Sequence, residues 1–384
     1  MKKAPPLAVL VLEGVAERRA APPEASPLAR ARKPNLDRLA AEGRVLSVRL
    51  IEDDAMAYGA APLLAILGFD PSKTEIARAS YLGMLAGEPL ASEECFVSAD
   101  FLALFRGSVA DPEPGPFRPA ETEILLRVAD GAMRRAGFRL LAGAGARHVA
   151  IATRASVDPH VPPPVLLLGR SIEEFEPRVA QHAFAHRLAR DVLDGHEINE
   201  VRRDLGRNGA DIVWLWGPGG PPFLHAHWDV PVSALGGDAL WRGIAKAAGI
   251  PLRVPNVRTP PGLAKGVAQA LKGGGICFVH AHRGTRDALL RDAAARTGGI
   301  ADLDENIVAP VAKGVAQARG RLLVVADVAR DTATGQPFAG PVPALLWGAG
   351  IDALRHLPFT EAGAAEAGDP LEPGHGLLAY VRHL

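Results

Sequence analysis

Between residues 262 and 326 the chain reads GLAKGVAQAL at 262–271, ICFV at 276–279, IADLDENIVAPVAKGVAQA at 300–318 and RLLVVA at 321–326. The two longer pieces have the apolar spacing and length of helices, and the two short pieces are apolar runs typical of buried strands. Parallel strands need a crossover connection, usually a helix, so this alternation predicts a parallel sheet covered by helices. The fold class expected from this stretch is α/β.

Elements of the same kinds continue on both sides of this stretch. The run LAVLVL at 7–12 predicts a strand that is covered on both faces. Further strands are expected at 148–153, 165–168, 211–216, 252–254 and 344–347, a short apolar element at 63–67, and helices at 34–43, 121–137, 173–194 and 239–248.

The domain organisation is marked by two proline-rich connections, DPEPGPFRP at 111–119 and DPHVPPP at 158–164. They bracket a smaller α+β domain expected at 96–190. This domain is then an insertion that divides a larger core into residues 1–95 and 191–384.

Composition excludes several classes of protein. Lys+Arg and Asp+Glu number 43 each, so the basic excess expected of a nucleic-acid-binding or anionic-membrane-binding protein is missing. The two cysteines, Cys95 and Cys277, are too few for a disulfide scaffold or a cysteine zinc ribbon. No apolar run approaches the ~20 residues that span a bilayer. We therefore expect a cytoplasmic protein with reduced thiols and no nucleic-acid or membrane partner; the sequence does not predict the oligomeric state.

Several blocks of residues, in order along nearly the whole chain, carry a family resemblance. They are Glu13-Gly14 with 33–37 and 42–45, LGFDP at 67–71, Arg147-His148 with Asp158-Pro159-His160, NEVRRDLGRNGADIVWLWG at 199–217, and Pro341-Val342-Pro343 with 347–351 and 359–361. Together they resemble the archaeal-type, cofactor-independent phosphoglycerate mutases of the alkaline-phosphatase superfamily. The resemblance implies a phosphatase-like core with an inserted domain and a substrate cleft between them, at the carboxyl ends of the core strands.

The chemistry that the resemblance implies is phosphoryl transfer by a serine beside two divalent cations, of which Mn, Zn and Mg are the candidates. A pair of cations needs several carboxylate and histidine ligands, and a metal-bound serine oxygen loses its proton more easily.

This chain departs from the family pattern at the residues that perform the chemistry. Glu13 stands where the family has an aspartate ligand, and its extra methylene shifts the carboxylate by more than about 1 Å. The nucleophile position falls on Gly59, so no catalytic residue is assigned. Of the ligand set, Glu13 and Asp327 are retained as vestigial metal ligands. The hypothesis is a mutase-like protein that has lost metal-dependent phosphoryl transfer.

The substrate-binding positions are better preserved. The resemblance assigns this role to Arg78, Arg147, His148, His160, Arg202, Arg203 and Lys265. Arginine grips phosphate and carboxylate groups in a bidentate manner, so a small phosphorylated or carboxylated ligand is expected. For the arginine pair at 202–203 the alternative is a structural salt link, and for His160 it is simple packing in its loop.

A second hypothesis keeps the protein an enzyme. His280 and His282 are two apart on an expected strand and share a face, and His225, His227 and Asp229 repeat that spacing. These residues would form a relocated metal site. The alternative is that they are ordinary polar residues at the carboxyl ends of strands or in loops. The protein is then an active mutase that interconverts 3- and 2-phosphoglycerate, or another metal-assisted phosphate-transfer enzyme. A purely structural role also stays open.

Overall fold

The structure is a computed structural model that describes residues 4–18, 22–225, 227–253, 259–282 and 291–384, without the side chain of His282. The chain forms two compact units. The first comprises Met1–Thr74 with Leu224–Leu384, and the second comprises Glu75–Phe223.

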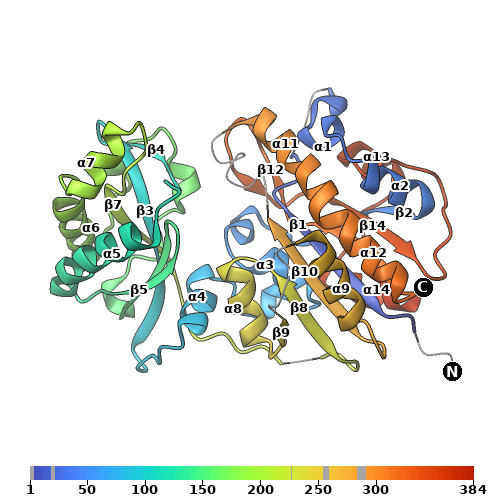
Figure 1. The fold of residues 1–384 in the computed structure, drawn as a ribbon. Coiled ribbons are helices and arrows are strands. Elements are labelled where there is room, and N and C mark those ends of the chain that lie inside the picture. The colour runs from blue at the N-terminus through green and yellow to red at the C-terminus, as the bar shows by residue number, and fades with distance from the viewer. Residues whose placement is uncertain (1–3, 19–21, 226, 254–258, 283–290) are drawn as a thin grey trace. The chain divides into compact units, whose positions relative to one another are not determined.

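Within the described residues, the first unit is built on a seven-stranded sheet in the order β2-β14-β11-β1-β10-β8-β9 (Figure 1). The strands β11, β1, β10, β8 and β9 are parallel to one another, whereas β14 is antiparallel to both β11 and β2. Their bounds are β1 (Leu7–Glu13), β2 (Arg44–Val48), β8 (Val232–Gly236), β9 (Leu252–Arg253), β10 (Ile276–His282), β11 (Arg321–Ala326) and β14 (Val342–Gly348). The α/β class and the mostly parallel sheet expected from the sequence are confirmed.

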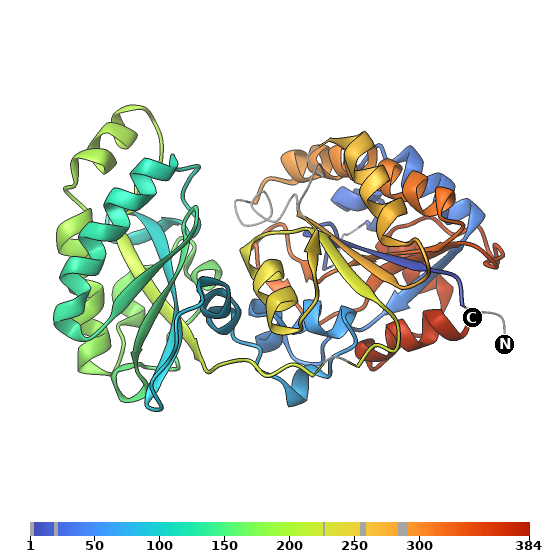
Figure 2. The same ribbon diagram turned by 60° about the horizontal axis from the view of Figure 1, so that its bottom comes forward.

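Strand β1 lies at the centre of this sheet because its residues are apolar on both faces. Residues 7–12 are almost completely buried, and β10 and β11 pair with β1 on its two sides. Two helices, α9 (Pro260–Ala270) and α12 (Ala309–Gln317), lie side by side over one face of the sheet (Figures 1 and 2). Burial on both faces is what an uninterrupted apolar strand predicts.

The other helices of the first unit surround this sheet. They are α1 (Pro27–Arg30), α2 (Pro34–Glu42), α3 (Ala61–Ile66), α8 (Ala239–Ala247), α11 (Ala293–Leu303), α13 (Glu361–Ala367) and α14 (Leu377–His383), and a small two-stranded sheet consists of β12 (Ala329–Arg330) and β13 (Pro337–Phe338). The helix expected at 300–318 is divided: a π-helical turn at Asp304–Val308 joins α11 to α12.

The second unit is an antiparallel sheet with helices. Its long strand β3 (Glu94–Phe105) pairs with β6 (Arg147–Thr153), with β7 (Ile212–Gly219) and with β4 (Ser108–Asp111). The edge strand β5 (Arg139–Ala144) pairs with β6. The helices α5 (Pro119–Met133) and α6 (Ala180–Leu193) form the core with alternate residues of β3, and the unit also contains α4 (Arg78–Ala86) and α7 (Glu197–Asp204).

The structure differs from the sequence expectation at three places. The second unit extends beyond the expected 96–190 at both ends, because β7 pairs with β3 instead of joining the core sheet. The strand expected at 165–168 is wrong: the prolines at 162–164 open a 3₁₀ turn, Pro164–Leu167. The long helix expected from 173 begins only at Ala180. In the part of the chain that the structure describes, no helix has both the length and the apolarity needed to cross a membrane.

The crossing of α9 and α12 depends on one glycine, and this yields a stability prediction. A Cβ at Gly314 of α12 would lie 2.5 Å from the carbonyl oxygen of Ala264 and 2.9 Å from the Val267 side chain. We expect Gly314→Ala to lower the free energy of unfolding by about 1–3 kcal/mol through overpacking. The matched control is Gly298→Ala in α11, where no described atom outside the helix's own backbone lies within 4 Å of the added carbon. It should raise stability by about 0.5–1 kcal/mol, since alanine is the better helix former. Urea unfolding followed by circular dichroism measures both, and equal effects would contradict the tight crossing.

Candidate functional site

The carboxyl ends of three neighbouring parallel strands bring together Glu13, His280 and Asp327. Glu13 ends β1, His280 lies in β10 beside Val11, and Asp327 follows β11 directly, with its N–H donating to the carbonyl of Leu12. The Glu13 Oε2 and His280 Nε2 atoms are 3.2 Å apart. Ligand sites of open α/β sheets lie at this edge, so this cluster is the candidate site of the first unit.

Asp327 is held against the turn that leaves β1. Its Oδ1 accepts a hydrogen bond of 3.0 Å from the N–H of Gly14, which has a φ of 76° and so takes a backbone conformation that suits glycine. Burial and then the negative charge of Glu13 raise the pKa of Asp327 to about 6. The turn therefore fixes this carboxyl group in a place where carrying a charge is costly.

His280 offsets part of that cost. Its ring is buried and stacked on the indole of Trp241, with the two ring centres 5.1 Å apart. Burial by itself lowers the pKa of His280. The hydrogen bond and charge of Glu13, with the charges of Asp238 and Asp327, outweigh burial and raise the pKa above its ordinary value. The negative charges around His280 thus favour its protonated form, whereas burial of the ring opposes it.

This arrangement does not fit a pair of divalent cations. Within the described residues, no group of three or more His, Cys, Asp or Glu side chains is placed to hold a metal ion. The Glu13 carboxylate faces the imidazole of His280 at 3.2 Å, so these two side chains already interact with each other. At the expected nucleophile position, Gly59 ends a 3₁₀ turn, Asp54–Tyr58, and brings no hydroxyl group.

The relocated metal site is likewise not assembled among the described residues. The ring of His227 packs against Phe69 and Trp228 at centre distances of 4.8 and 4.6 Å, and Asp229 pairs with Arg382. The backbone of His282 pairs with Glu13 in the sheet, but its side chain lies outside the described residues.

The four arginines expected to hold the substrate all lie in the second unit, and each has a carboxylate partner there. The N–O distances are 2.6 Å for Arg78–Asp100, 2.6 Å for Arg147–Glu113, 3.0 Å for Arg202–Glu121 and 2.8 Å for Arg203–Asp211. Their positive charges are therefore already balanced within the unit, and a ligand anion would compete with these carboxylates.

The block at 199–217 has a clear structural role. The buried amide of Asn199 donates to the carbonyls of Leu193 and Ala210 and accepts from the N–H of Ala210, all at 2.7–2.9 Å. It thereby connects the end of α6 to the chain that enters β7. Arg202 is 2% exposed; it donates to the carbonyls of Asn208 and Pro116, and its guanidinium stacks on Phe117.

Three further expected site residues lie on different elements of the chain. His148 is fully buried in the second unit, where its Nδ1 accepts from the N–H of Gly143. His160 is exposed in its loop, and Lys265 is exposed on α9 of the first unit.

Asp100, which binds Arg78, was not predicted as a site residue from the sequence. Asp100 accepts from Arg78 and from the indole N–H of Trp216, which lies on the neighbouring strand β7. The pattern Ser98-Ala99-Asp100 interrupts an apolar run, and a buried carboxylate in such a strand is the signal that could have marked it.

Comparison with known proteins identifies the relatives of this chain. It is 26% identical over 377 residues to the 2,3-bisphosphoglycerate-independent phosphoglycerate mutase of Methanosarcina barkeri, covering 92% of this chain and 90% of that one. The mutase of Methanothrix thermoacetophila is 25% identical over 377 residues, with 93% and 94% covered. The chain is related to the cofactor-independent phosphoglycerate mutases. No protein-family model matches it.

Two solved structures have the same fold as this chain. A protein from Pyrococcus horikoshii superposes with a TM-score of 0.70 at 20% identity, covering 99% of this chain and 97% of the other. The cofactor-independent phosphoglycerate mutase from Thermoplasma acidophilum gives a TM-score of 0.54 at 17% identity, with 99% of each chain covered. The expected alkaline-phosphatase-like architecture is thereby confirmed.

The structural role of Asn199 leads to a prediction. Asn199→Ala leaves the N–H and the carbonyl of Ala210 without their side-chain partner and removes one of two donors to the carbonyl of Leu193, so we expect the second unit to lose about 2–4 kcal/mol of stability. The control Asn208→Ala removes an exposed amide with one hydrogen bond to Asp111 and should cost less than about 1 kcal/mol. Hydrogen exchange of peptides from residues 75–223 reports the second unit separately. If Asn199→Ala lowers the stability of the second unit no more than the control does, the structural role of Asn199 is contradicted.

Three buried histidines of the second unit yield a pH prediction. Burial lowers the pKa of His148 to about 3, of His182 to about 4, and of His186 well below the ordinary 6.5. In the unfolded chain these imidazoles bind protons near pH 6.5, so the unfolded state binds more protons below that pH. The second unit should therefore be most stable above pH 6.5 and lose stability progressively as the pH falls toward 4.

The variant His148→Asn tests this prediction, since the asparagine oxygen still accepts from Gly143. It should reduce the slope of stability against pH by up to about 1.4 kcal/mol per pH unit. His160→Asn is the control, because the exposed His160 meets water in folded and unfolded chains alike. Stability of residues 75–223 that stays constant between pH 7 and 4.5 in the wild type would contradict the neutral buried state.

Proposed function

We propose that this chain is a phosphoglycerate-mutase-like protein that does not carry out metal-dependent phosphoryl transfer. The observation that carries the proposal is the contact of 3.2 Å between Glu13 and His280 at the carboxyl ends of the core strands. Where the family resemblance implies cation ligands, this chain has a carboxylate paired with a histidine of raised pKa.

The loss of the nucleophile supports the same proposal. Gly59 offers no hydroxyl group at the position where the family resemblance implies the phosphoryl acceptor, and a phosphoryl group without cations would keep its negative charge unstabilised. Covalent catalysis and charge stabilisation are both large contributions to rate. Their combined loss is expected to lower turnover by more than about 10³-fold.

A phosphorylated or carboxylated small molecule is the proposed ligand. The Nε–H of Arg78 is buried and has no acceptor within the described residues, although the Nη2 atom of the same guanidinium binds Asp100. An anion that accepts from Nε would satisfy this donor. The proposed location is the cytoplasm, which suits Cys95 and Cys277, because both are buried thiols without a disulfide.

The activity test uses the full chain with 3-phosphoglycerate and Mn²⁺, Mg²⁺ or Co²⁺ in turn, and the Methanosarcina barkeri relative assayed in parallel as the positive control. We expect no formation of 2-phosphoglycerate above the protein-free blank. Elemental analysis of the purified chain is the second measurement, with less than stoichiometric Mn or Zn expected. Metal-stimulated turnover, or one or more tightly bound ions per chain, would instead favour the active enzyme.

A further inference from the structure

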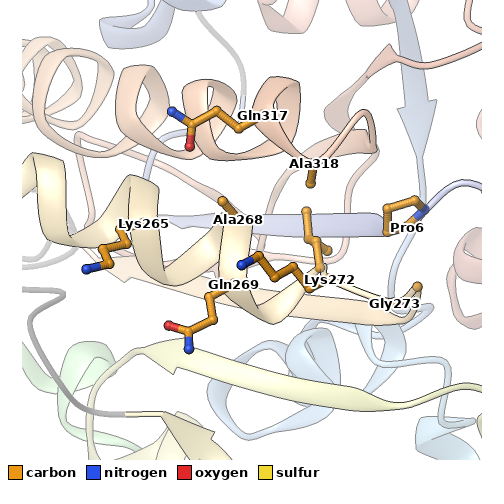
Figure 3. A pocket seen from close by; sticks show the side chains of 10 residues that line it. Pro6, Lys265, Ala268, Gln269, Lys272, Gly273, Gln317 and Ala318 are labelled. Atoms are coloured by element: carbon orange, nitrogen blue, oxygen red, sulfur yellow. The ribbon is translucent and has the colours of Figure 1, made fainter.

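A pocket of about 680 Å³ lies in the first unit at the end of the sheet where β1 and β10 begin. Figure 3 shows Lys265 and Gln269 on α9, Lys272 just after it, and Gln317 on the facing helix α12. Pro6, which precedes β1, lines it as well. The volume suits a metabolite-sized molecule.

Two copies of one hexapeptide form the walls of this pocket. The sequence KGVAQA occupies 265–270 on α9 and 313–318 on α12, so that Gln269 and Gln317 hold equivalent positions. Close contact at Gly314 holds the two helices together, as described above. The repeat thus supplies two amide groups to one hollow from two sides.

The base of the pocket is a firm part of the fold. The N–H of Leu7 donates to the carbonyl of Gly275 at 3.0 Å, and the N–H of Arg321 donates to the carbonyl of Pro6 at 2.8 Å. Leu271 in the lining is 1% exposed. Because these contacts tie three strands together, the pocket needs little rearrangement to receive a ligand.

The polar groups of the lining are cationic or neutral. The described residues that line the pocket include no aspartate or glutamate. Lys265 and Lys272 have no ion-pair partner in the described part of the chain, whereas Lys33 and Lys73 pair with Asp37 and Asp70. The pocket therefore places two uncompensated positive charges around a concave surface.

The carboxyl ends of the two nearby helices do not reverse the preference of the pocket for anions. Both α9 and α12 end at the pocket, and helix carboxyl ends favour cations. Several of the carbonyls at these ends, however, already accept from backbone N–H groups: those of Val267 and Gln269 in α9, and those of Gly314, Val315 and Ala316 in α12. The side-chain groups left to meet a ligand are the two ammonium groups and the two amides, which donate hydrogen bonds to anionic oxygens.

We propose that this pocket is a binding site for a small multivalent anion that carries phosphate or carboxylate groups. It is separate from the cluster of Glu13, His280 and Asp327, which lies at the opposite ends of β1 and β10. The inference does not depend on the presence or absence of mutase activity.

Isothermal titration calorimetry of the full chain with inorganic pyrophosphate, and in a second arm with citrate, tests the proposal. We expect saturable binding at one site per chain that weakens as NaCl is raised. The double variant Lys265→Gln/Lys272→Gln should weaken binding at least about tenfold, because two charged donors are lost. Lys313→Gln is the matched control, since Lys313 holds the position of Lys265 in the second hexapeptide, is exposed, and is not among the lining residues.

Each result decides the proposal. Saturable binding that the double variant weakens and Lys313→Gln leaves within about twofold supports it, and the stronger of the two probes tells phosphate from carboxylate recognition. The absence of saturable binding of both probes overturns it, and so does an equal loss in the control variant. Binding that the double variant leaves unchanged also overturns it, since the anion then lies elsewhere, for instance at Arg78.

Discussion

The pairing of β1 with β10 on one side and β11 on the other determines what the first unit can do. Because the three strands are parallel, the residues that follow their carboxyl ends lie together at one edge of the sheet. The residues that precede their amino ends lie together at the opposite edge. The first edge holds Glu13, His280 and Asp327, and the second holds Pro6 and the pocket between α9 and α12. One apolar hexapeptide, LAVLVL, therefore positions both candidate sites.

Several buried charged side chains in the described part of both units have an oppositely charged or hydrogen-bonding partner. A buried carboxylate without a partner costs several kcal/mol, and Asp100, Asp327 and Glu17 each have compensating groups. Arg296 illustrates the same rule: it is fully buried, and it donates to the carboxylate of Glu17 and to the carbonyl of Gly14, next to Glu13. His280 lies beside Glu13 in the same way, with its Nε2 atom 3.2 Å from the carboxylate.

The sequence predicted elements well where one kind of residue dominates a segment. The strands at 7–12 and 321–326 are uninterrupted apolar runs, and the helices at 34–43 and 239–248 have clear spacing and caps. Strand β3 was missed because Ser98 and Asp100 break its apolar run, and only the fold reveals that Arg78 and Trp216 satisfy that carboxylate. The second unit ends at Phe223 and not at the expected residue 190, because β7 pairs with β3. That pairing joins residues that are more than 100 positions apart, and local sequence patterns do not reveal it.

For the candidate site too, the position of a residue in the sheet was easier to predict from the sequence than its side-chain contacts. Family resemblance placed Glu13 and Asp327 at the correct sheet edge, because strand order fixes where a residue lies. It did not predict that Glu13 would contact His280, since that contact depends on side-chain reach and on the stacking of His280 against Trp241. The longer glutamate side chain extends farther from β1 than an aspartate would, and here it ends 3.2 Å from the neighbouring strand's imidazole. The contact between Glu13 and His280 therefore depends on the length of the side chain at position 13 as well as on the pairing of β1 with β10.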